Sequence, residues 1–283
     1  NKIPIVWSVR EVPGANSIIR KWHINKIEKL SNHIIFSSKY VMNYFNDSPN
    51  NSVLHNSVNI ENFRLDKSKY NKRIRNKYNI ENNAILLCMI GSVQYEKGHF
   101  LLIEAIKLVK KKYKNFQILI IAGGINDQYK NSLKGKIKRI LRIPYDNLDK
   151  MKKVIEHNSL EKHFVFTGYV TEIPKILCAV DVVLFPSLMA EGFGRPILEG
   201  MASGVPVIAS GIGPSKEILG ENAGLLLQRI NSKELANSIN YLISNSELRR
   251  EKGKAGFKRV SISFESGKIK KTFNNIIRKQ ISS

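Results

Sequence analysis

The sequence has 283 residues, of which 42% are hydrophobic and 8% aromatic, so a disordered chain is excluded and two modest cores are possible. No apolar run reaches 18 residues and the first residues lack a secretory signal pattern, so neither a membrane-spanning helix nor a signal peptide is predicted. The formal net charge of +23 indicates attraction to polyanions, whether nucleic acid, anionic lipid or phosphorylated substrates.

Residues 1–83 alternate apolar segments with amphipathic ones. Strands are predicted at residues 3–9, 33–37 and 53–55, and helices at residues 16–30, 39–45 and 68–78. This alternation predicts the second half of a Rossmann-like domain. The sequence begins on its first strand without an initiator Met, so we expect it to be N-terminally incomplete.

Residues 84–262 form a second α/β region. Strands are predicted at residues 84–90, 116–122, 163–168, 181–187, 205–209 and, as an edge strand, 224–227. Helices are predicted at residues 99–113, 147–157, 172–179, 214–219, 232–245 and 247–260, and around Glu199. Short apolar runs that alternate with helices are typical of a parallel sheet buried on both faces. Cys88 and Cys178 lie in apolar segments, which indicates buried free thiols of a cytosolic protein.

The segment 129–143 carries six basic residues and no acidic one, interleaved with Leu and Ile. This pattern fits an amphipathic helix on an anionic membrane surface, and it equally fits a solvated surface helix. The segment 264–281 is also basic and amphipathic. The whole pattern predicts two α/β units with a cleft between them.

The stretch 191–209 is the most informative part of the sequence. Glu191 and Glu199 bracket a Gly-x-Gly turn, and Pro196 suits the first turn of a helix. Ligands of open α/β sheets lie outside the carboxyl ends of the strands, where this loop is predicted to fall. A helix N-terminus with free amides binds phosphate, and Glu199 lies about one turn into this helix. The pattern therefore indicates a site for a ligand with both phosphates and hydroxyls.

The stretch 191–207 stands among several ordered motifs. The others are Gly91-x-x-x-x-Glu-Lys97-Gly98, Gly123-Gly124, Phe166-Thr-Gly168, Asp181 to Ser187, Gly224-Leu-Leu and, in the first region, Asn56, Val58, Asn59 and Phe63. Together they resemble family 4 of the glycosyltransferases, retaining enzymes with the GT-B fold of two facing Rossmann-like domains. The resemblance covers residues 84–262. It implies that 1–83 belong to an acceptor domain, that 84–262 bind the donor, and that 263–283 form a helix packing back on the first domain.

The resemblance also implies roles for individual residues. The expected catalytic residues are Glu191, Lys97 and Arg10, and the expected donor-binding residues are Glu199, Gly192, Phe193, Gly194, Arg195, Gly91, Ser92, Thr167, Tyr169 and Val170, of which Arg10 and Ser92 do not match the family pattern. Glu199 would accept hydrogen bonds from the ribose hydroxyls of a nucleotide-sugar. Glu191 would face the donor sugar, and Lys97 would neutralise the departing diphosphate. Thr167, Tyr169 and Val170 would flank the base.

Two positions depart from the family pattern. Ser92 stands where members often carry a second phosphate-binding Arg, and Arg10 stands near the place of a His that contacts the donor sugar. Arg is a permanent cation and cannot serve as a general base. We expect Arg10 to contact sugar, phosphate or acceptor, or else to form an ion pair with Glu11 or Glu28.

The resemblance implies transfer of a sugar from a nucleotide-diphosphate-sugar to a saccharide or lipid-linked acceptor in cell-surface polysaccharide or glycolipid synthesis. No Asp-x-Asp motif or metal-ligand spacing is present, so a metal-independent reaction without another cofactor is expected. The expected location is cytoplasmic, with peripheral contact to an anionic inner membrane face as an open expectation.

Two other functions are considered. The first is a polyanion-binding protein with a vestigial transferase site, but the sequence contains no nucleic-acid-binding motif and no nucleic acid is expected as partner. The second is a nucleotide-sugar 2-epimerase, which needs acid and base residues in the first domain. The candidates there, Glu11, His23 and Asp47, do not lie in a motif.

Overall fold

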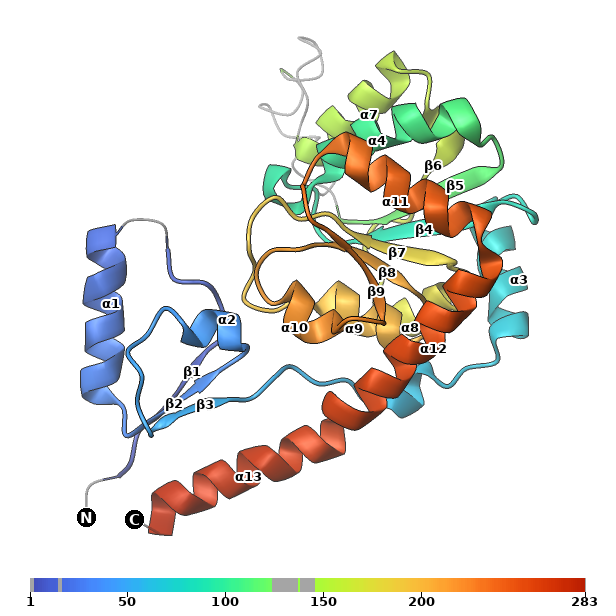
Figure 1. Cartoon of the computed structure of the whole chain (residues 1–283). Helices are drawn as coiled ribbons and strands as arrows, with labels where there is room; N and C mark the ends of the chain where they lie inside the picture. Colours follow the sequence, from blue (N-terminus) through green and yellow to red (C-terminus); the bar gives the residue numbers. More distant parts are fainter. Residues whose placement is uncertain (1–2, 15–16, 124–136, 138–145, 283) are drawn as a thin grey trace.

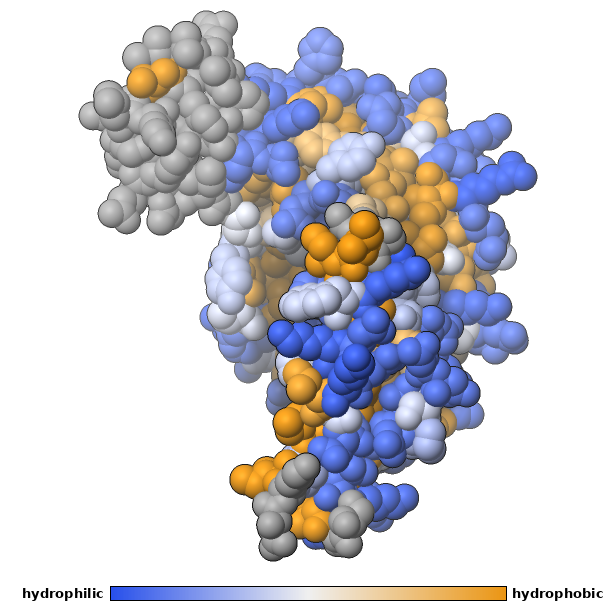
Figure 2. All heavy atoms as spheres, turned by 90° about the vertical axis from the view of Figure 1, so that its left-hand side faces the viewer, coloured by the Kyte–Doolittle hydropathy of each residue, from blue (hydrophilic) through white to orange (hydrophobic). Residues whose placement is uncertain are grey.

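The computed structural model describes residues 3–14, 17–123, 137 and 146–282 (Figure 1). The first unit has a parallel sheet in the order β1-β2-β3. Its elements are β1 (Val6–Val9), α1 (Ser17–Leu30), β2 (His33–Phe36), α2 (Lys39–Met42) and β3 (Asn51–Val53). Ile34, Phe36 and Val41 form its small buried cluster. Several large apolar side chains of α1 are exposed to solvent. Ile18 is 80% exposed and Trp22 is 56% exposed, on the side of the molecule that faces the viewer in Figure 2.

The second unit is built on a parallel sheet in the order β6-β5-β4-β7-β8-β9. The strands are β4 (Ile85–Ile90), β5 (Phe116–Ile121), β6 (Phe164–Phe166), β7 (Val182–Phe185), β8 (Val207–Ser210) and β9 (Gly224–Leu227). The chain adds strands on one side of β4 and then, from β7 onwards, on the other side. The sheet therefore has a switch point between β4 and β7, the place where such sheets open a crevice for ligands.

Helices cover both faces of this sheet (Figure 1). Among the described residues from 60 onwards, the helices are η1 (Ile60–Phe63), α3 (Lys67–Lys77), η2 (Tyr95–Lys97), α4 (His99–Lys112), α7 (Asn147–His157), η3 (Glu161–His163), α8 (Ile173–Leu177), α9 (Arg195–Ala202), α10 (Ser215–Leu219), α11 (Ser232–Ser244), α12 (Ser246–Ser263) and α13 (Ser266–Ser282). Helices α4, α7 and α11 pack on one face, and α8, α9, α10 and α12 on the other. The predicted α/β class with parallel sheets is confirmed.

Some predicted element bounds differ from the observed ones. The third strand, expected at residues 53–55, is Asn51–Val53, because its polar residues pair with β2 through the backbone. The helix expected at residues 39–45 ends at Met42, where Asn43 caps it and tight turns follow. The first strand begins only at Val6. By contrast, α7 and β9 have the predicted bounds, and β9 is the predicted edge strand.

The junction of α12 and α13 is tied to the connector between the two units. The Val58 amide donates to the Phe264 carbonyl at 3.0 Å, and the Ser266 amide donates to the Val58 carbonyl at 3.0 Å. From there α13 runs beneath the first unit (Figure 1). Packing of residues 263–283 on the first domain stays a prediction. Within the described part of the chain, no helix is both long and apolar enough to span a membrane.

Candidate functional site

A cavity of about 840 Å³ lies between the two units, at the carboxyl ends of β4, β5 and β7. We call it the interdomain cleft. The predicted site residues that line it are Arg10, Gly91, Ser92, Lys97, Tyr169, Val170, Glu191, Gly192, Phe193, Gly194, Arg195 and Glu199. Residues distant in sequence thus meet at the switch point of the sheet. Glu191 and Glu199, which are eight residues apart in the sequence, both line this cleft.

The glycines of the signature turn allow the two units to approach closely. A Cβ atom on Gly192 would lie 1.9 Å from the Arg10 carbonyl oxygen, which no side chain could tolerate. Gly194 has a φ of 150°, a conformation that side chains strongly disfavour, and it precedes α9 as its cap residue. The turn therefore brings the first unit against the start of α9.

The first turn of α9 is open toward the cleft. Pro196 lies in this turn and no side chain caps it. Pro196 has no amide hydrogen and the Ile197 amide donates to the Gly194 carbonyl at 3.0 Å, so this turn attracts anions such as phosphate mainly through the helix dipole. Arg195 lines the cleft at the same place with a side chain that is 73% exposed. This end of the cleft is therefore suited to a diphosphate.

Glu199 is a buried carboxylate in the wall of the cleft. Its side chain is only 12% exposed, and burial raises the pKa of its carboxyl group although the Arg195 guanidinium lies 3.1 Å away. A carboxylate that has lost most of its water gains strongly from hydroxyl donors. Glu199 is thus prepared to bind a ligand with hydroxyl groups.

Lys97 and Glu191 form an ion pair across the cleft. The Lys97 Nζ lies 2.7 Å from Glu191 Oε2, and the Ser187 hydroxyl donates to Glu191 Oε1 at 2.7 Å. Lys97 ends η2, and its position depends on Gly98, where a Cβ would lie 2.0 Å from the Pro186 carbonyl oxygen. Sequence reasoning did not foresee the contact of Ser187, although this residue ends the motif 181–187 and lies two residues after β7.

The first unit holds the signature turn with residues that the sequence did not single out. The hydroxyls of Ser37 and Ser38, both buried, donate to the Gly192 carbonyl at 2.9 and 3.0 Å. The Glu217 carboxylate of α10 accepts from His55 Nε2 at 2.6 Å and from the Lys39 amide at 3.0 Å. We call these two sets of contacts the interdomain clasp. The only sequence signal was the place of the serines, just after a strand.

Other predicted residues have different surroundings. Thr167 is outside the cleft lining, and its hydroxyl donates to the Gly168 carbonyl at 2.9 Å. Tyr169 lines the cleft but is 82% exposed. In the described part of the chain, Arg10 forms an ion pair with neither Glu11 nor Glu28. The Glu28 carboxylate instead accepts hydrogen bonds from the backbone amide and the side chain of Asn46, both at 2.8 Å.

Cys88 and Cys178 are buried free thiols, as predicted. Among the described residues, no group of three or more His, Cys, Asp or Glu side chains could hold a metal ion. The basic segment 129–143 lies outside the described residues except for Ile137.

Residues 71–259 match the family described as glycosyl transferases group 1. The chain belongs to this family. Among its relatives, the capsular polysaccharide biosynthesis glycosyltransferase CapM of Staphylococcus aureus is 26% identical over 212 residues, which are 75% of this chain and 50% of CapM. A GDP-mannose-dependent alpha-(1-6)-phosphatidylinositol monomannoside mannosyltransferase of Mycobacterium tuberculosis is 25% identical over 263 residues, which are 88% of this chain and 60% of that enzyme.

Solved structures of glycosyltransferases share the fold. The structure of Anabaena Alr3699/HepE in complex with UDP and glucose matches with a TM-score of 0.83 at 20% identity, and the match covers 97% of this chain and 71% of that one. The chain spans about half the length of the curated relatives it matches. Membership of the group 1 glycosyltransferases thus agrees with the parallel α/β architecture expected of the GT-B fold.

Proposed function

We propose that this group 1 glycosyltransferase chain binds a nucleotide-diphosphate-sugar in the interdomain cleft and takes part in transferring the sugar with retention, as family 4 enzymes do. The observation that carries the proposal is that Glu199 and the uncapped first turn of α9 face one cavity of about 840 Å³. A buried carboxylate suits ribose hydroxyls and a helix N-terminus suits a diphosphate. The structure of HepE in complex with UDP and glucose supports this donor class.

The ion pair of Lys97 and Glu191 suggests how the site changes on donor binding. The Lys97 Nζ lies 2.7 Å from Glu191 Oε2. A diphosphate on α9 would compete for this ammonium group, leaving Glu191 to orient the sugar hydroxyls or to stabilise positive charge at the anomeric carbon. Negative charge on the diphosphate grows as its bond to the sugar breaks, so Lys97 would bind the transition state more tightly than the ground state.

The proposed transfer needs no protein base. The bond between the anomeric carbon and the diphosphate oxygen breaks, and the acceptor hydroxyl oxygen forms the new bond on the same face of the sugar. The hydroxyl proton passes to the departing diphosphate. Arg10, which lines the cleft and cannot accept a proton, would contact sugar, phosphate or acceptor.

The proposed acceptor is a saccharide or a lipid-linked molecule, and the proposed process is the synthesis of a cell-surface polysaccharide or glycolipid. The similarity to CapM, a capsular polysaccharide biosynthesis enzyme, and to the mycobacterial phosphatidylinositol monomannoside mannosyltransferase supports these two classes. A cytoplasmic site and contact of residues 129–143 with an anionic membrane belong to the same proposal. The epimerase alternative gains no support. Among its three candidate residues, only Glu11 is in the described lining of the cleft.

The test is nucleotide binding by the full-length protein. UDP, GDP and ADP are compared by thermal shift, and the best ligand is titrated into Glu199→Gln and into Glu156→Gln, an exposed control on α7. Losing a charged acceptor for the ribose hydroxyls should weaken binding by about tenfold or more in the first variant only. Unchanged affinity of Glu199→Gln would exclude the proposed site.

A further inference from the structure

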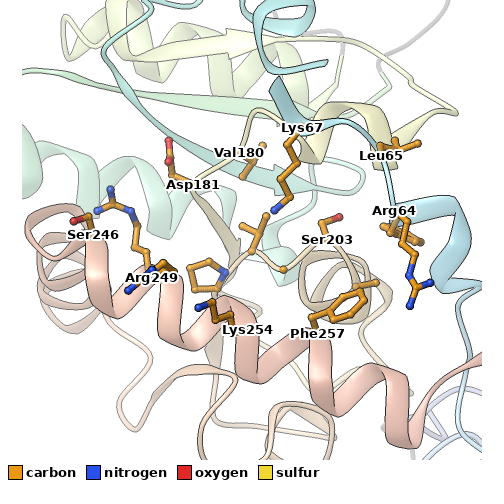
Figure 3. Close-up of a pocket in the computed structure, with 16 residues that line it drawn as sticks. Arg64, Leu65, Lys67, Val180, Asp181, Ser203, Ser246, Arg249, Lys254 and Phe257 are labelled. Atoms are coloured by element: carbon orange, nitrogen blue, oxygen red, sulfur yellow. The ribbon is translucent and has the colours of Figure 1, made fainter. Parts of the chain in front are cut away.

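A second cavity, of about 720 Å³, lies at the opposite edge of the second sheet, and we call it the basal pocket (Figure 3). Its walls include Val180 and Asp181, just before β7, and Val205 and Pro206, just before β8. The interdomain cleft lies at the carboxyl ends of the strands. The basal pocket lies at the amino ends and shares no described lining residue with it. A ligand there would therefore bind independently of the sugar donor.

The basal pocket is strongly positive. Five cationic side chains line it, namely Arg64, Lys67, Arg249, Arg250 and Lys254. The only carboxylate in the described lining is Asp181, which accepts from the Leu86 amide at 2.8 Å and lies 3.6 Å from the Arg75 guanidinium. Its charge is therefore already balanced. The remaining field in the pocket attracts anions.

All three arginines of the pocket already have partners. Arg64 pairs with Glu61 at 3.1 Å, and Arg250 pairs with Glu247 at 2.7 Å. Arg249 donates to the carbonyls at the end of α11, of which that of Leu242 lies at 2.6 Å. These interactions fix the arginines at the wall of the pocket and reduce their availability to a ligand.

Lys67 and Lys254 differ from these arginines. In the described part of the chain, neither ammonium group has a hydrogen-bond or ion-pair partner. Figure 3 shows Lys67 pointing into the pocket from the first residue of α3, and its Nζ lies 3.6 Å from where a Cβ on Gly204 would be. Lys254 lies on α12 and also lines the pocket (Figure 3). Two available ammonium groups thus face one hollow.

Beside the charged groups, Ser203 and Ser246 line the pocket, and a larger part of its wall is apolar. This apolar part includes Phe63, Val180, Val205, Pro206 and Phe257. The volume of about 720 Å³ falls within the range of small-molecule sites. Compact ammonium groups bind phosphate as point charges, and an apolar wall favours a carbon-rich remainder. A phosphate group attached to an organic part matches both features.

We propose that the basal pocket is a second binding site, separate from the donor cleft, for an organic molecule that carries a phosphate group, with Lys67 and Lys254 as the ligands of that group. The phosphate can come from a free metabolite or from a phospholipid headgroup. Both sources present the same anionic oxygens. Because the lysines are exposed, binding should weaken as the ionic strength rises.

The test compares two double variants of the full-length protein. Lys67→Gln/Lys254→Gln removes both ligands, and Lys111→Gln/Lys233→Gln removes the same charge from exposed positions outside both pockets. Inorganic phosphate binding is measured by calorimetry, and sedimentation is measured with phosphatidylcholine vesicles with or without phosphatidylglycerol. Diffraction from crystals soaked in tungstate locates the anion.

We expect Lys67→Gln/Lys254→Gln to lose about tenfold or more in affinity for phosphate or for the phosphatidylglycerol vesicles, whichever represents the natural ligand. The control variant should keep its affinity. If only the affinity for inorganic phosphate falls, the ligand is a free metabolite. If the affinity for phosphatidylglycerol vesicles falls, the ligand is a phospholipid headgroup. Equal binding by both variants in both arms, or tungstate density away from the two lysines, would overturn the proposal. Nucleotide affinity should stay unchanged in both variants, which separates this outcome from failure of the donor site.

Discussion

The two units of the chain differ in how they are stabilised. The second unit buries aliphatic cores on both faces of its sheet, whereas the first has a small cluster around Phe36 and leaves Ile18 and Trp22 largely exposed to solvent. The first unit nevertheless supplies Arg10 to the cleft. Its position over the cleft therefore depends on contacts with the second unit, chiefly at Gly192 and Glu217. Substitutions there test this difference.

Gly192→Ala should have the largest effect. The added Cβ would lie 1.9 Å from the Arg10 carbonyl oxygen, so the two units would have to separate. A displacement of about 1 Å at reacting groups can cost about a hundredfold in rate, and we expect at least that loss in kcat/KM of the full-length transferase. Circular dichroism should show an intact fold. Gly14→Ala, where the Cβ would meet no atom within 4 Å, is the control, and equal activity of the two variants would refute the prediction.

Sequence reasoning predicted the second unit better than the contacts between units. Strands such as Ile85–Ile90 are continuous apolar runs between turn residues, so their position follows from local pattern. The bonds from Ser37 and Ser38 to Gly192 join residues about 155 positions apart, and no local pattern encodes them. Lys97 and Glu191 were each predicted as site residues. Their ion pair was not, because it depends on how two loops meet.

Replacing both serines of the clasp should have an intermediate effect. In Ser37→Ala/Ser38→Ala the buried Gly192 carbonyl would lose both hydroxyl donors, at 2.9 and 3.0 Å. Leaving a buried acceptor unsatisfied costs roughly 1–3 kcal/mol. We therefore expect a fall in turnover of roughly ten- to a hundredfold, with little change in nucleotide affinity. The control is Ser261→Ala, whose hydroxyl donates to the Phe257 carbonyl within α12. Equal turnover in both variants would mean that the serines do not hold the turn.

The smallest effect is expected at Glu217, and it should depend on pH. Burial raises the pKa of its carboxyl group, but hydrogen bonds from His55 and the Lys39 amide outweigh this and lower the pKa below its ordinary value of 4.5. Because this pKa is lower in the folded state than in the unfolded state, the ionised carboxylate stabilises the fold. The stabilisation is complete above pH 4.5 and is lost as the pH falls through the lower pKa of the folded state. Glu217→Gln should therefore unfold at a lower temperature than the unsubstituted protein at neutral pH, and the two should converge in acid. Glu156→Gln, exposed on α7, should change the melting temperature little. A difference between Glu217→Gln and the unsubstituted protein that is constant from neutral to acid pH would show that the ionised carboxylate does not hold the units together.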